Sequence, residues 1–349
     1  MILSSLFPHT ASRTFRALTA ALALCLCAAG APRAQQSPQD DDPVERVNTS
    51  LVLLNVGVAD RRGRAVTDLT RGDFAVYEDG VKQNIVNFEP AASPFSLVLL
   101  LDMSGSTRNF RPTLKQSALR FLDALGPEDR VAVISFSKEI KTLSGFTTDR
   151  RNTAFAITEL ADGRGETSFY GALRYSLKQL AGEGKRRKAV IVLSDGLDTE
   201  LSAQDRKTTS SAATPEEAVA TVKPDEAAPL RTVLDSADRQ GVTIYPLALP
   251  SGDPKRLLPL TPQQAAVYAA ARARMNTLAN RTGGRLHQIN RLEDMGRLYA
   301  EVAADMRALY SIAYQSSNPR PRDGSWRAIS VEVTRADTIA RSRPGYYAR

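Results

Sequence analysis

Between Phe95 and Arg307 the chain alternates short, continuously apolar runs with longer stretches of helical periodicity. Strands that helices cover on both faces read as solid apolar runs, and this alternation is typical of βαβ units that build a parallel sheet. The sequence therefore predicts an α/β fold with a doubly wound, mostly parallel sheet. The expected strands are 96–101, 131–136, 189–193, 242–249 and 285–289, and the expected helices are 112–125, 152–160, 170–182, 230–240, 265–282 and 292–309. A short strand at 140–144 follows its predecessor too closely for a helical crossover, so we expect it to pair antiparallel at an edge.

Two segments of β character flank this region. The earlier flank, 44–93, holds short extended patterns and the pair Asp79-Gly80, which is a strong hairpin signal. The later flank, 310–349, holds extended patterns separated by turns rich in Pro, Arg and Gly. Because an isolated two-stranded hairpin is marginally stable, we predict that both flanks form one small β subdomain. The α/β domain, 94–309, would then be inserted between them.

One stretch interrupts the alternating pattern. Residues 201–229 are rich in Ser, Thr, Ala, Glu and Pro, a composition typical of segments that bury little apolar surface. We therefore expect a flexible surface insertion there, and the sequence leaves its role open. We expect Thr147, Thr148 and Asp149 to form a turn or a cap before the helix that follows them.

The N-terminus has the pattern of a secretory signal peptide. Arg13 and Arg16 precede an uncharged stretch, 17–31, that is rich in Ala and Leu and is shorter than the roughly 20 residues of a membrane-spanning helix. Small residues near its end favour cleavage between about residue 28 and residue 34. We therefore expect a signal peptide over 1–34 and a disordered leader over 35–43. The mature protein would be exported, either periplasmic or secreted, without a stable membrane span.

Charge and cysteine content restrict the classes of function. The formal charge of +8 falls to +5 (8 − 3) when Arg13, Arg16 and Arg33 leave with the signal. The basic residues are scattered and are not interleaved with aromatic residues, which argues against nucleic-acid binding. Both cysteines, Cys25 and Cys27, lie within the signal, so the mature chain has neither a disulfide nor thiol chemistry.

Polar side chains follow the ends of two apolar runs. Asp102, Ser104 and Ser106 come after the first run, and alternate residues of an extended segment point the same way. Thr167 lies in a Gly-flanked loop before a helix, and Asp195 follows the third run. Ligands of open α/β sheets bind outside the carboxyl ends of the strands, so these five side chains should lie at one edge. Carboxylate and hydroxyl oxygens suit Mg²⁺, Mn²⁺ or Ca²⁺, and the sequence therefore predicts a divalent metal site.

This pattern resembles the metal-ion-dependent adhesion site of the von Willebrand factor type A (VWFA) family, whose motif is Asp-x-Ser-x-Ser, then a Thr, then an Asp. The five residues match that motif in order, within about 95–307. The resemblance implies a VWFA fold, which is Rossmann-like. It also implies that Ser104, Ser106 and Thr167 ligate the metal, that Asp102 and Asp195 act directly or through water, and that the Asp or Glu of a partner protein completes the octahedron.

The flanks carry a narrower resemblance. The segments GRAVTDLTRGDFAVYEDGVKQNIVNFE and GSWRAISVEVTR are similar to those of a secreted bacterial VWFA-related family first described in acidobacteria. This resemblance covers nearly the whole mature chain. It adds little about function, because that family is poorly characterised.

Hydrolysis is the main rival function. A Ser-His-Asp triad needs a histidine, but His9 leaves with the signal, and His287 lies in an expected strand, where a structural role is favoured. The chain has no Gly-x-Ser-x-Gly elbow, no His-x-x-x-His pair and no Walker-type phosphate loop. We therefore expect a non-enzymatic, metal-dependent binding and adhesion module. The alternative is a β-rich envelope scaffold in which the metal site is vestigial.

Overall fold

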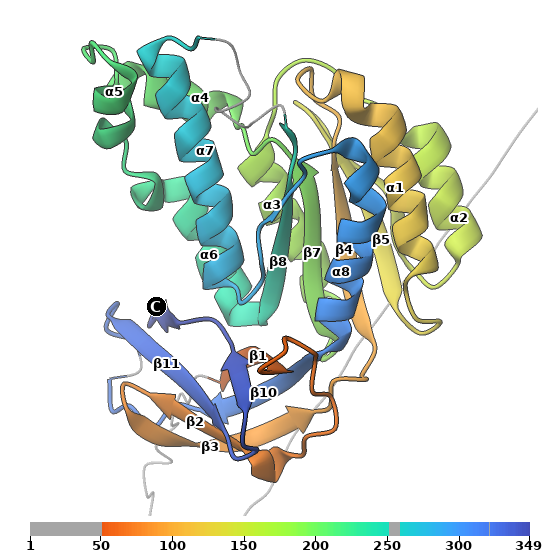
Figure 1. The fold of residues 1–349 in the computed structure, drawn as a ribbon, viewed down its shortest axis with the longest axis vertical. Coiled ribbons are helices and arrows are strands. Elements are labelled where there is room, and N and C mark those ends of the chain that lie inside the picture. The colour runs from red at the N-terminus through yellow and green to blue at the C-terminus, as the bar shows by residue number, and fades with distance from the viewer. Residues whose placement is uncertain (1–50, 251–258, 321) are drawn as a thin grey trace, which may run out of the picture. The chain divides into compact units, whose positions relative to one another are not determined.

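The computed structural model describes residues 51–250, 259–320 and 322–349 (Figure 1). The predicted signal peptide, 1–34, and leader, 35–43, lie outside the described residues. In the part of the chain that the structure describes, no helix is both long enough and apolar enough to cross a membrane.

A six-stranded sheet forms the α/β part of the chain. Its strands are β4 (Phe95–Asp102), β5 (Arg130–Phe136), β6 (Ile140–Thr147), β7 (Arg187–Ser194), β8 (Val242–Ala248) and β9 (His287–Gln288). They lie in the order β6-β5-β4-β7-β8-β9. Every neighbouring pair is parallel except β5 with β6, which is antiparallel and lies at the edge, as predicted. The expected doubly wound, mostly parallel sheet is therefore confirmed.

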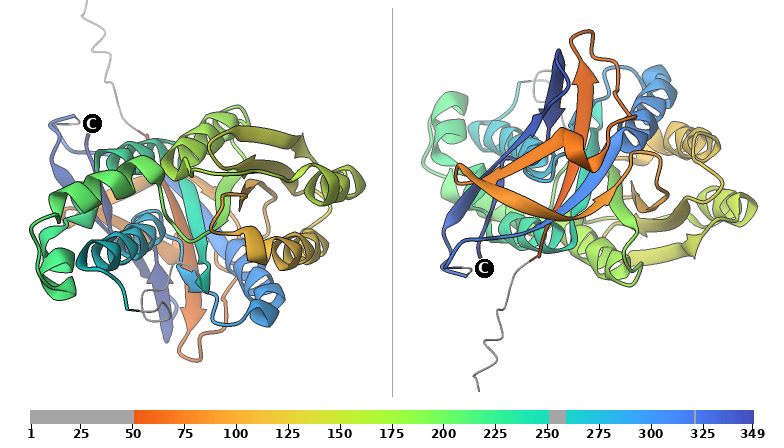
Figure 2. Two further views of the ribbon diagram at one scale, coloured as in Figure 1. Left: turned by 90° about the horizontal axis from the view of Figure 1, so that it is seen from above. Right: turned by 90° about the horizontal axis from the view of Figure 1, so that it is seen from below.

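Helices cover both faces of this sheet (Figure 2). They are α1 (Arg111–Asp123), α2 (Arg150–Phe155), α3 (Phe169–Ala181), α6 (Ala228–Gln240), α7 (Pro262–Arg281) and α8 (Met295–Arg307). A π-helical turn, Ala156–Leu160, continues α2. The Asp149 side chain accepts hydrogen bonds from two N–H groups in the first turn of α2, so the expected cap is present.

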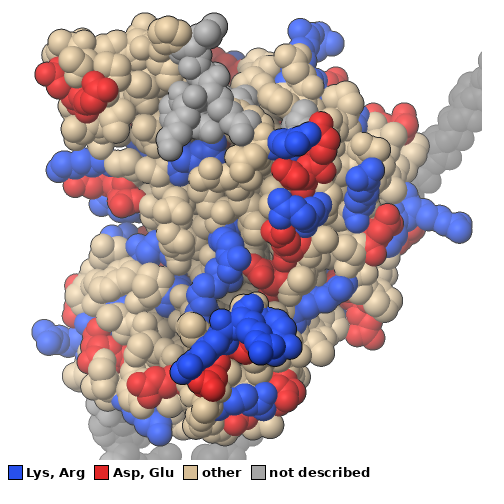
Figure 3. All heavy atoms as spheres, in the orientation of Figure 1, with Lys and Arg blue, Asp and Glu red and all other residues tan. Residues whose placement is uncertain are grey.

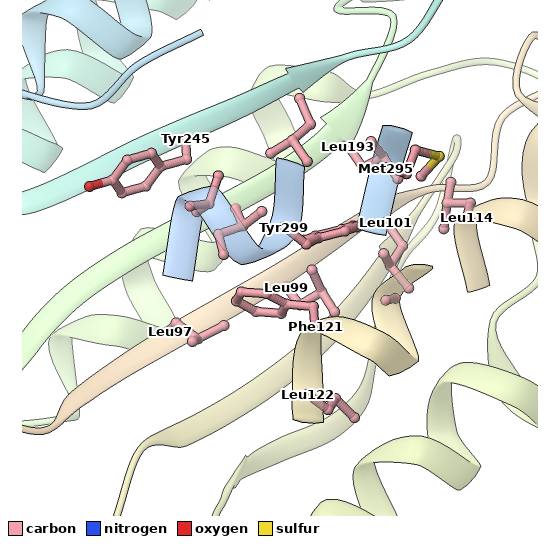
Figure 4. Packing of buried hydrophobic residues seen from close by; sticks show 14 of the residues in the cluster. Leu97, Leu99, Leu101, Leu114, Phe121, Leu122, Leu193, Tyr245, Met295 and Tyr299 are labelled. Atoms are coloured by element: carbon pink, nitrogen blue, oxygen red, sulfur yellow. The ribbon is translucent and has the colours of Figure 1, made fainter. Parts of the chain in front are cut away.

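The two faces of β4 explain why its sequence is continuously apolar. Leu97, Leu99 and Leu101 belong to the core on the side of α1 and α8, where the rings of Phe121 and Tyr299 lie 5.1 Å apart (Figure 4). The residues between these leucines belong to the opposite core, with α3, α6 and α7. A strand that is buried on both faces has no position for alternating polar residues.

The expectation of a flexible insertion over 201–229 is wrong. The segment is largely helical and contains most of α4 (Thr199–Thr208), all of α5 (Pro215–Thr221) and a 3-10 turn, η4 (Pro224–Glu226). Both helices begin at a capped residue: the side chain of Asp198 accepts from the N–H of Leu201, and that of Thr214 accepts from the N–H of Glu217.

Contacts with α7 explain why this segment is ordered despite its polar composition. Ala218 and Val222 pack against small residues of α7, whose short side chains let the two helices approach closely. Arg274 of α7 makes a bidentate ion pair with Asp205 of α4, with N–O distances of 2.6 and 2.8 Å. Tertiary packing has therefore outweighed composition in this segment.

Strands from both flanks share a second, antiparallel sheet. Its strands are β1 (Leu51–Asp60), β2 (Phe74–Glu78), β3 (Val81–Glu89), β10 (Leu309–Gln315), β11 (Trp326–Val333), β12 (Thr338–Arg341) and β13 (Gly345–Tyr347). Their order, β12-β1-β10-β3-β2-β11-β13, interleaves the early and late flanks. The predicted pairing of the two flanks is thus present in this sheet, for example between β2 and β11.

The turn at Asp79-Gly80 connects β2 to β3, as the sequence indicated. Both residues have a positive φ, +50° and +80°, which suits the tight connection between Glu78 and Val81. Glu78 itself is buried and accepts hydrogen bonds from the hydroxyls of Tyr314 (2.6 Å) and Ser316 (2.6 Å). This carboxylate of the early flank therefore holds residues of the late flank.

Polar contacts join the antiparallel sheet to the base of the α/β sheet. Asn55 of β1 donates to the carbonyl of Gly241 at 2.8 Å, and Arg343 pairs with the buried Asp238 of α6 at 2.5 Å. Basic and acidic side chains lie interspersed on the face shown in Figure 3. That distribution favours a solvated surface, which the scattered basic residues of the sequence also indicate.

Candidate metal centre

The candidate site lies where the direction of strand addition reverses. β4 has β5 on one side and β7 on the other, and Leu101 of β4 is paired with Leu193 of β7. The chain continues from β4 to β5 and only later returns to add β7 and β8 on the opposite side. Loops diverge at such a switch point and leave a crevice outside the carboxyl ends of the strands. Asp102 ends β4 and Asp195 directly follows β7, so both aspartates lie at this edge of the sheet.

Asp102 is fully buried, and its carboxylate is held on both oxygens. The N–H of Ser104 donates to Oδ1 at 2.9 Å, and the hydroxyl of Ser194 donates to Oδ2 at 2.5 Å. These bonds fix the carboxylate at the end of β4 before any ligand arrives.

The loop after Asp102 brings the two candidate serines together. The hydroxyl oxygens of Ser104 and Ser106 are 3.2 Å apart. Thr107 holds this loop in place, because its hydroxyl donates to the backbone carbonyls of Asp102 (2.8 Å) and Ser104 (3.0 Å). Ser104 is buried and Ser106 is exposed, so the pair extends from the buried carboxylate to the surface.

Backbone bonds tie Thr167 to its neighbouring loops. The N–H of Thr167 donates to Oγ1 of Thr199 at 2.8 Å, and the N–H of Thr199 donates to the carbonyl of Thr167 at 2.9 Å. The N–H of Gly105 donates to the carbonyl of Gly165 at 3.2 Å and so connects this loop to the serine loop. The Thr167 loop is therefore fastened both to the serine loop and to the start of α4.

Asp195 is buried, with 1% of its surface exposed, and it precedes a tight turn. Gly196 adopts a φ of +80°, and a Cβ at this position would lie 2.3 Å from the sulfur of Met275 on α7. The turn therefore requires glycine for both its conformation and its close approach to α7.

The electrostatics of the site favour a cation. Burial, and after it the negative charge of Asp195, raise the pKa of Asp102 from 3.8 to about 7. Hydrogen bonds from Ser104 and Ser194 oppose this rise. A divalent cation beside both carboxylates would compensate for their burial and for their mutual repulsion.

A hollow of about 250 Å³ opens beside these loops. Ser106 and Thr167 line it together with Arg206 of α4 and Tyr268 of α7. The exposed end of the candidate ligand set therefore faces a space that a partner's side chain can enter.

The comparisons with known proteins identify the fold around this site. The sequence of residues 97–197 matches the family model described as the von Willebrand factor type A domain. This part of the chain is a VWFA domain. VWFA domains are modules for protein–protein interaction, and many bind a divalent metal. The matched range contains all five candidate ligands.

Solved structures are similar to parts of this chain at low sequence identity. An aerotolerance-related membrane protein of Bacteroides fragilis has 13% identity and a TM-score of 0.43, over 61% of this chain and 98% of that chain. A proximal thread matrix protein of the mussel byssus, with zinc in its metal-ion-dependent adhesion motif, has 13% identity and a TM-score of 0.43, over 64% of this chain and 48% of that chain. A VWFA protein of Catenulispora acidiphila has 11% identity and a TM-score of 0.43, over 87% of this chain and 74% of that chain. No curated protein matches the chain.

The residues of this VWFA domain fit a hard divalent cation. The candidate set offers two carboxylates and three hydroxyls, all of them oxygen donors. Within residues 51–250, 259–320 and 322–349, no cluster of three or more His, Cys, Asp or Glu side chains is placed to hold a metal. A metal at this edge would therefore depend on hydroxyls as much as on carboxylates, which suits Mg²⁺ better than metals that prefer nitrogen or sulfur.

Sequence reasoning missed two residues that shape the candidate site. Ser194 holds the Asp102 carboxylate, and its position directly before Asp195 is the one signal that would have indicated it. Arg111, at the start of α1, donates from Nη2 to the carbonyls of Met103, Ser104 and Gly163. No local pattern reveals the contact between Arg111 and Gly163, because the two residues are 52 positions apart.

Proposed function

We propose that this chain is an exported, non-enzymatic binding and adhesion module that captures a carboxylate of a partner protein through a divalent cation. Asp102, Ser104, Ser106, Thr167 and Asp195 are the proposed ligands, and Mg²⁺ is the proposed metal, with Mn²⁺ or Ca²⁺ as alternatives. The observation that carries this proposal is the arrangement of the five residues: buried carboxylates at two neighbouring strand ends, and hydroxyls that lead from them to an open hollow.

Charge balance supports an acidic partner. The three hydroxyl ligands are neutral, so the two aspartates supply the formal negative charge of the set. When Asp195 acts through water, Asp102 alone neutralises the first shell, and the cation keeps about one net positive charge. Mg²⁺ prefers six oxygens, and the set supplies at most five, so one position remains for water or for an anionic oxygen from a partner.

The surroundings of His287 support a function other than hydrolysis. His287 is buried in β9, and burial lowers its pKa below 6.5. The charged groups that act on it are Asp305, Glu301, Arg285 and Arg341. None of them belongs to the candidate site, and a Ser-His-Asp triad would need this histidine beside a nucleophilic serine.

A pull-down from the envelope fraction tests the proposal. The wild-type protein, loaded with Mg²⁺, should retain a partner that is released by excess chelator. Asp102→Ala should retain none of it while keeping the fold, because the side chain lies at the end of a strand rather than in a hydrophobic core. Asp123→Ala, which removes the same charge from the exposed end of α1, is the matched control and should behave as the wild type.

The alternative function is a structural scaffold with a vestigial metal site. The interleaved antiparallel sheet, built from both flanks, is the observation that favours it. A partner that binds equally well to Asp102→Ala, or in excess chelator, would support the scaffold and exclude capture through a metal. Membership of the acidobacterial-type family stays a proposal that rests on the flanking sequences.

A further inference from the structure

Among the residues that the structure describes, Arg206 is the one charged side chain that lines the hollow beside the candidate metal ligands. Arg206 lies on α4 and lines the same hollow as Ser106 and Thr167. Its side chain is exposed, and among the residues that the structure describes its guanidinium makes no hydrogen bond and no ion pair. A guanidinium that lacks a partner in the fold is available for an anion from outside.

The preceding residue fixes the direction in which Arg206 points. Asp205 is buried and holds Arg274 of α7 through two charge-assisted bonds, which sets the rotation of α4 against α7. Successive residues of an α-helix are turned by about 100° from one another. With Asp205 directed at α7, Arg206 is presented at the hollow instead of at the core.

Tyr268 of α7 lines the same hollow as Arg206. Burial raises the pKa of Tyr268, the charge of Asp195 raises it further, and the charge of Arg206 lowers it. Its hydroxyl is therefore within electrostatic reach of both a candidate metal ligand and Arg206. Val267, on the same helix, adds an apolar contact to the wall.

The hollow is larger than one carboxylate needs. Its volume of about 250 Å³ corresponds to roughly eight water molecules at ~30 Å³ each. A carboxylate at the metal would leave most of this space, including the part beside Arg206, for the next side chains of the partner.

We infer that Arg206 forms a second anion subsite, so that the partner segment presents two acidic side chains, one to the metal and one to this arginine. This inference rests on the proposed function, because the first carboxylate is captured by the metal. In an extended segment, side chains two residues apart point the same way and are about 6.6 Å apart along the chain. The partner motif is therefore an acidic residue, any residue, and a second acidic residue.

The test uses two synthetic peptides and the full mature chain loaded with Mg²⁺. The diacid probe is acetyl-Glu-Ala-Glu-amide and the monoacid probe is acetyl-Glu-Ala-Gln-amide. Their affinities are compared by NMR titration at 0.15 M salt, with and without excess chelator. We expect the wild type to bind the diacid about fivefold more tightly than the monoacid.

Two variants distinguish a specific anion subsite at Arg206 from a general effect of positive charge on peptide binding. Arg206→Gln should bind both peptides with the monoacid affinity, while its own affinity for Mg²⁺ stays at the wild-type value. Lys207→Gln is the matched control, since it removes the same charge from the next position of α4, which does not line the hollow. It should keep the preference for the diacid.

The outcomes distinguish the two proposals. Equal affinities in the wild type, a preference that survives in Arg206→Gln, or an equal loss in Lys207→Gln would overturn the anion subsite and leave metal-dependent capture intact. Absence of binding of both peptides, or binding that persists in excess chelator, would overturn the proposed function, and the subsite with it.

Discussion

The hydroxyl of Ser194 donates a 2.5 Å hydrogen bond to Oδ2 of Asp102 and so joins the ends of β7 and β4. The same hydroxyl accepts a bond from the N–H of Gly196 at 3.0 Å. Asp195 lies between Ser194 and Gly196 in the sequence, so the Ser194 side chain sets the position of both candidate carboxylates. The spacing of the proposed metal ligands thus depends on a residue outside the family motif.

Replacing Ser194 with Ala should weaken metal binding without unfolding the protein. Asp102 loses the donor to Oδ2 that holds its pKa down, so the ionised carboxylate becomes less favourable. We expect a Mg²⁺ affinity lower by about tenfold and a free energy of unfolding lower by ~1–2 kcal/mol. Ser176→Ala, at a buried serine of α3 that bonds the carbonyl of Ala172, is the matched control. An equal loss of Mg²⁺ affinity in that control would contradict the role of Ser194.

Gly196→Ala should damage both the fold and the site. Its φ of +80° disfavours any side chain, and the new Cβ would meet the sulfur of Met275 at 2.3 Å. Gly63 has a similar φ of +77° with nothing within 4 Å, so Gly63→Ala measures the cost of the backbone conformation alone. In urea unfolding, we expect Gly63→Ala to lower the free energy of unfolding by about 1 kcal/mol and Gly196→Ala to lower it clearly more. Equal losses in the two variants would show that the contact with Met275 carries no cost.

Breaking the buried pair between Asp205 and Arg274 should destabilise the protein strongly. The side chains of Arg274 and Asp205 are 5% and 6% exposed. Removal of one partner therefore leaves the other charged group buried. Asp205→Ala should therefore cost ~3–5 kcal/mol in the free energy of unfolding. The double variant Asp205→Leu with Arg274→Met replaces both charges and should recover most of this loss. A double variant as unstable as the single one would contradict this explanation.

The free energy of unfolding should decrease as the pH is lowered through the range in which His287 titrates. Burial lowers its pKa in the folded state below 6.5, so the unfolded chain binds the proton more readily. With respect to His287, the stability of the folded state is therefore greatest above pH 6.5 and decreases as the pH falls below that value. The raised pKa of Asp102 acts in the opposite direction in the absence of metal. The comparison with His287→Gln therefore isolates the histidine.

Urea unfolding at pH 7.5 and pH 5.5 measures this difference. We expect the wild type to lose more stability than His287→Gln on acidification, in a background where all other groups are the same. Equal losses in the two proteins would show that the histidine is not disfavoured in its charged form.

Much of the fold follows from the sequence because the signals are local. The run from Leu97 to Leu101 is apolar at every position, which is typical of a strand covered on both faces, and the structure buries it on both faces. The five candidate ligands are also found from local patterns, since each lies at the end of an apolar run or in a Gly-flanked loop. Parallel strands bring such ends to one edge.

The remainder depends on contacts between distant segments. Arg111 holds the serine loop and the Gly163 loop together, and its role appears only after β4 and the later loop are adjacent. The helices within 201–229 were not predicted for another reason, because their composition is typical of a solvated loop. Their caps, Asp198 and Thr214 followed by Pro215, are local signals that composition alone does not weigh.

Calorimetric titration of the mature chain with Mg²⁺ at pH 8 tests whether the proposed metal centre exists. We expect one Mg²⁺ per chain, no binding to Asp102→Ala, and an affinity about tenfold weaker for Thr167→Ala, which loses one neutral ligand. The exposed Asp123→Ala should bind as the wild type does. No saturable binding by the wild type, or full affinity in Asp102→Ala, would contradict the proposed metal centre.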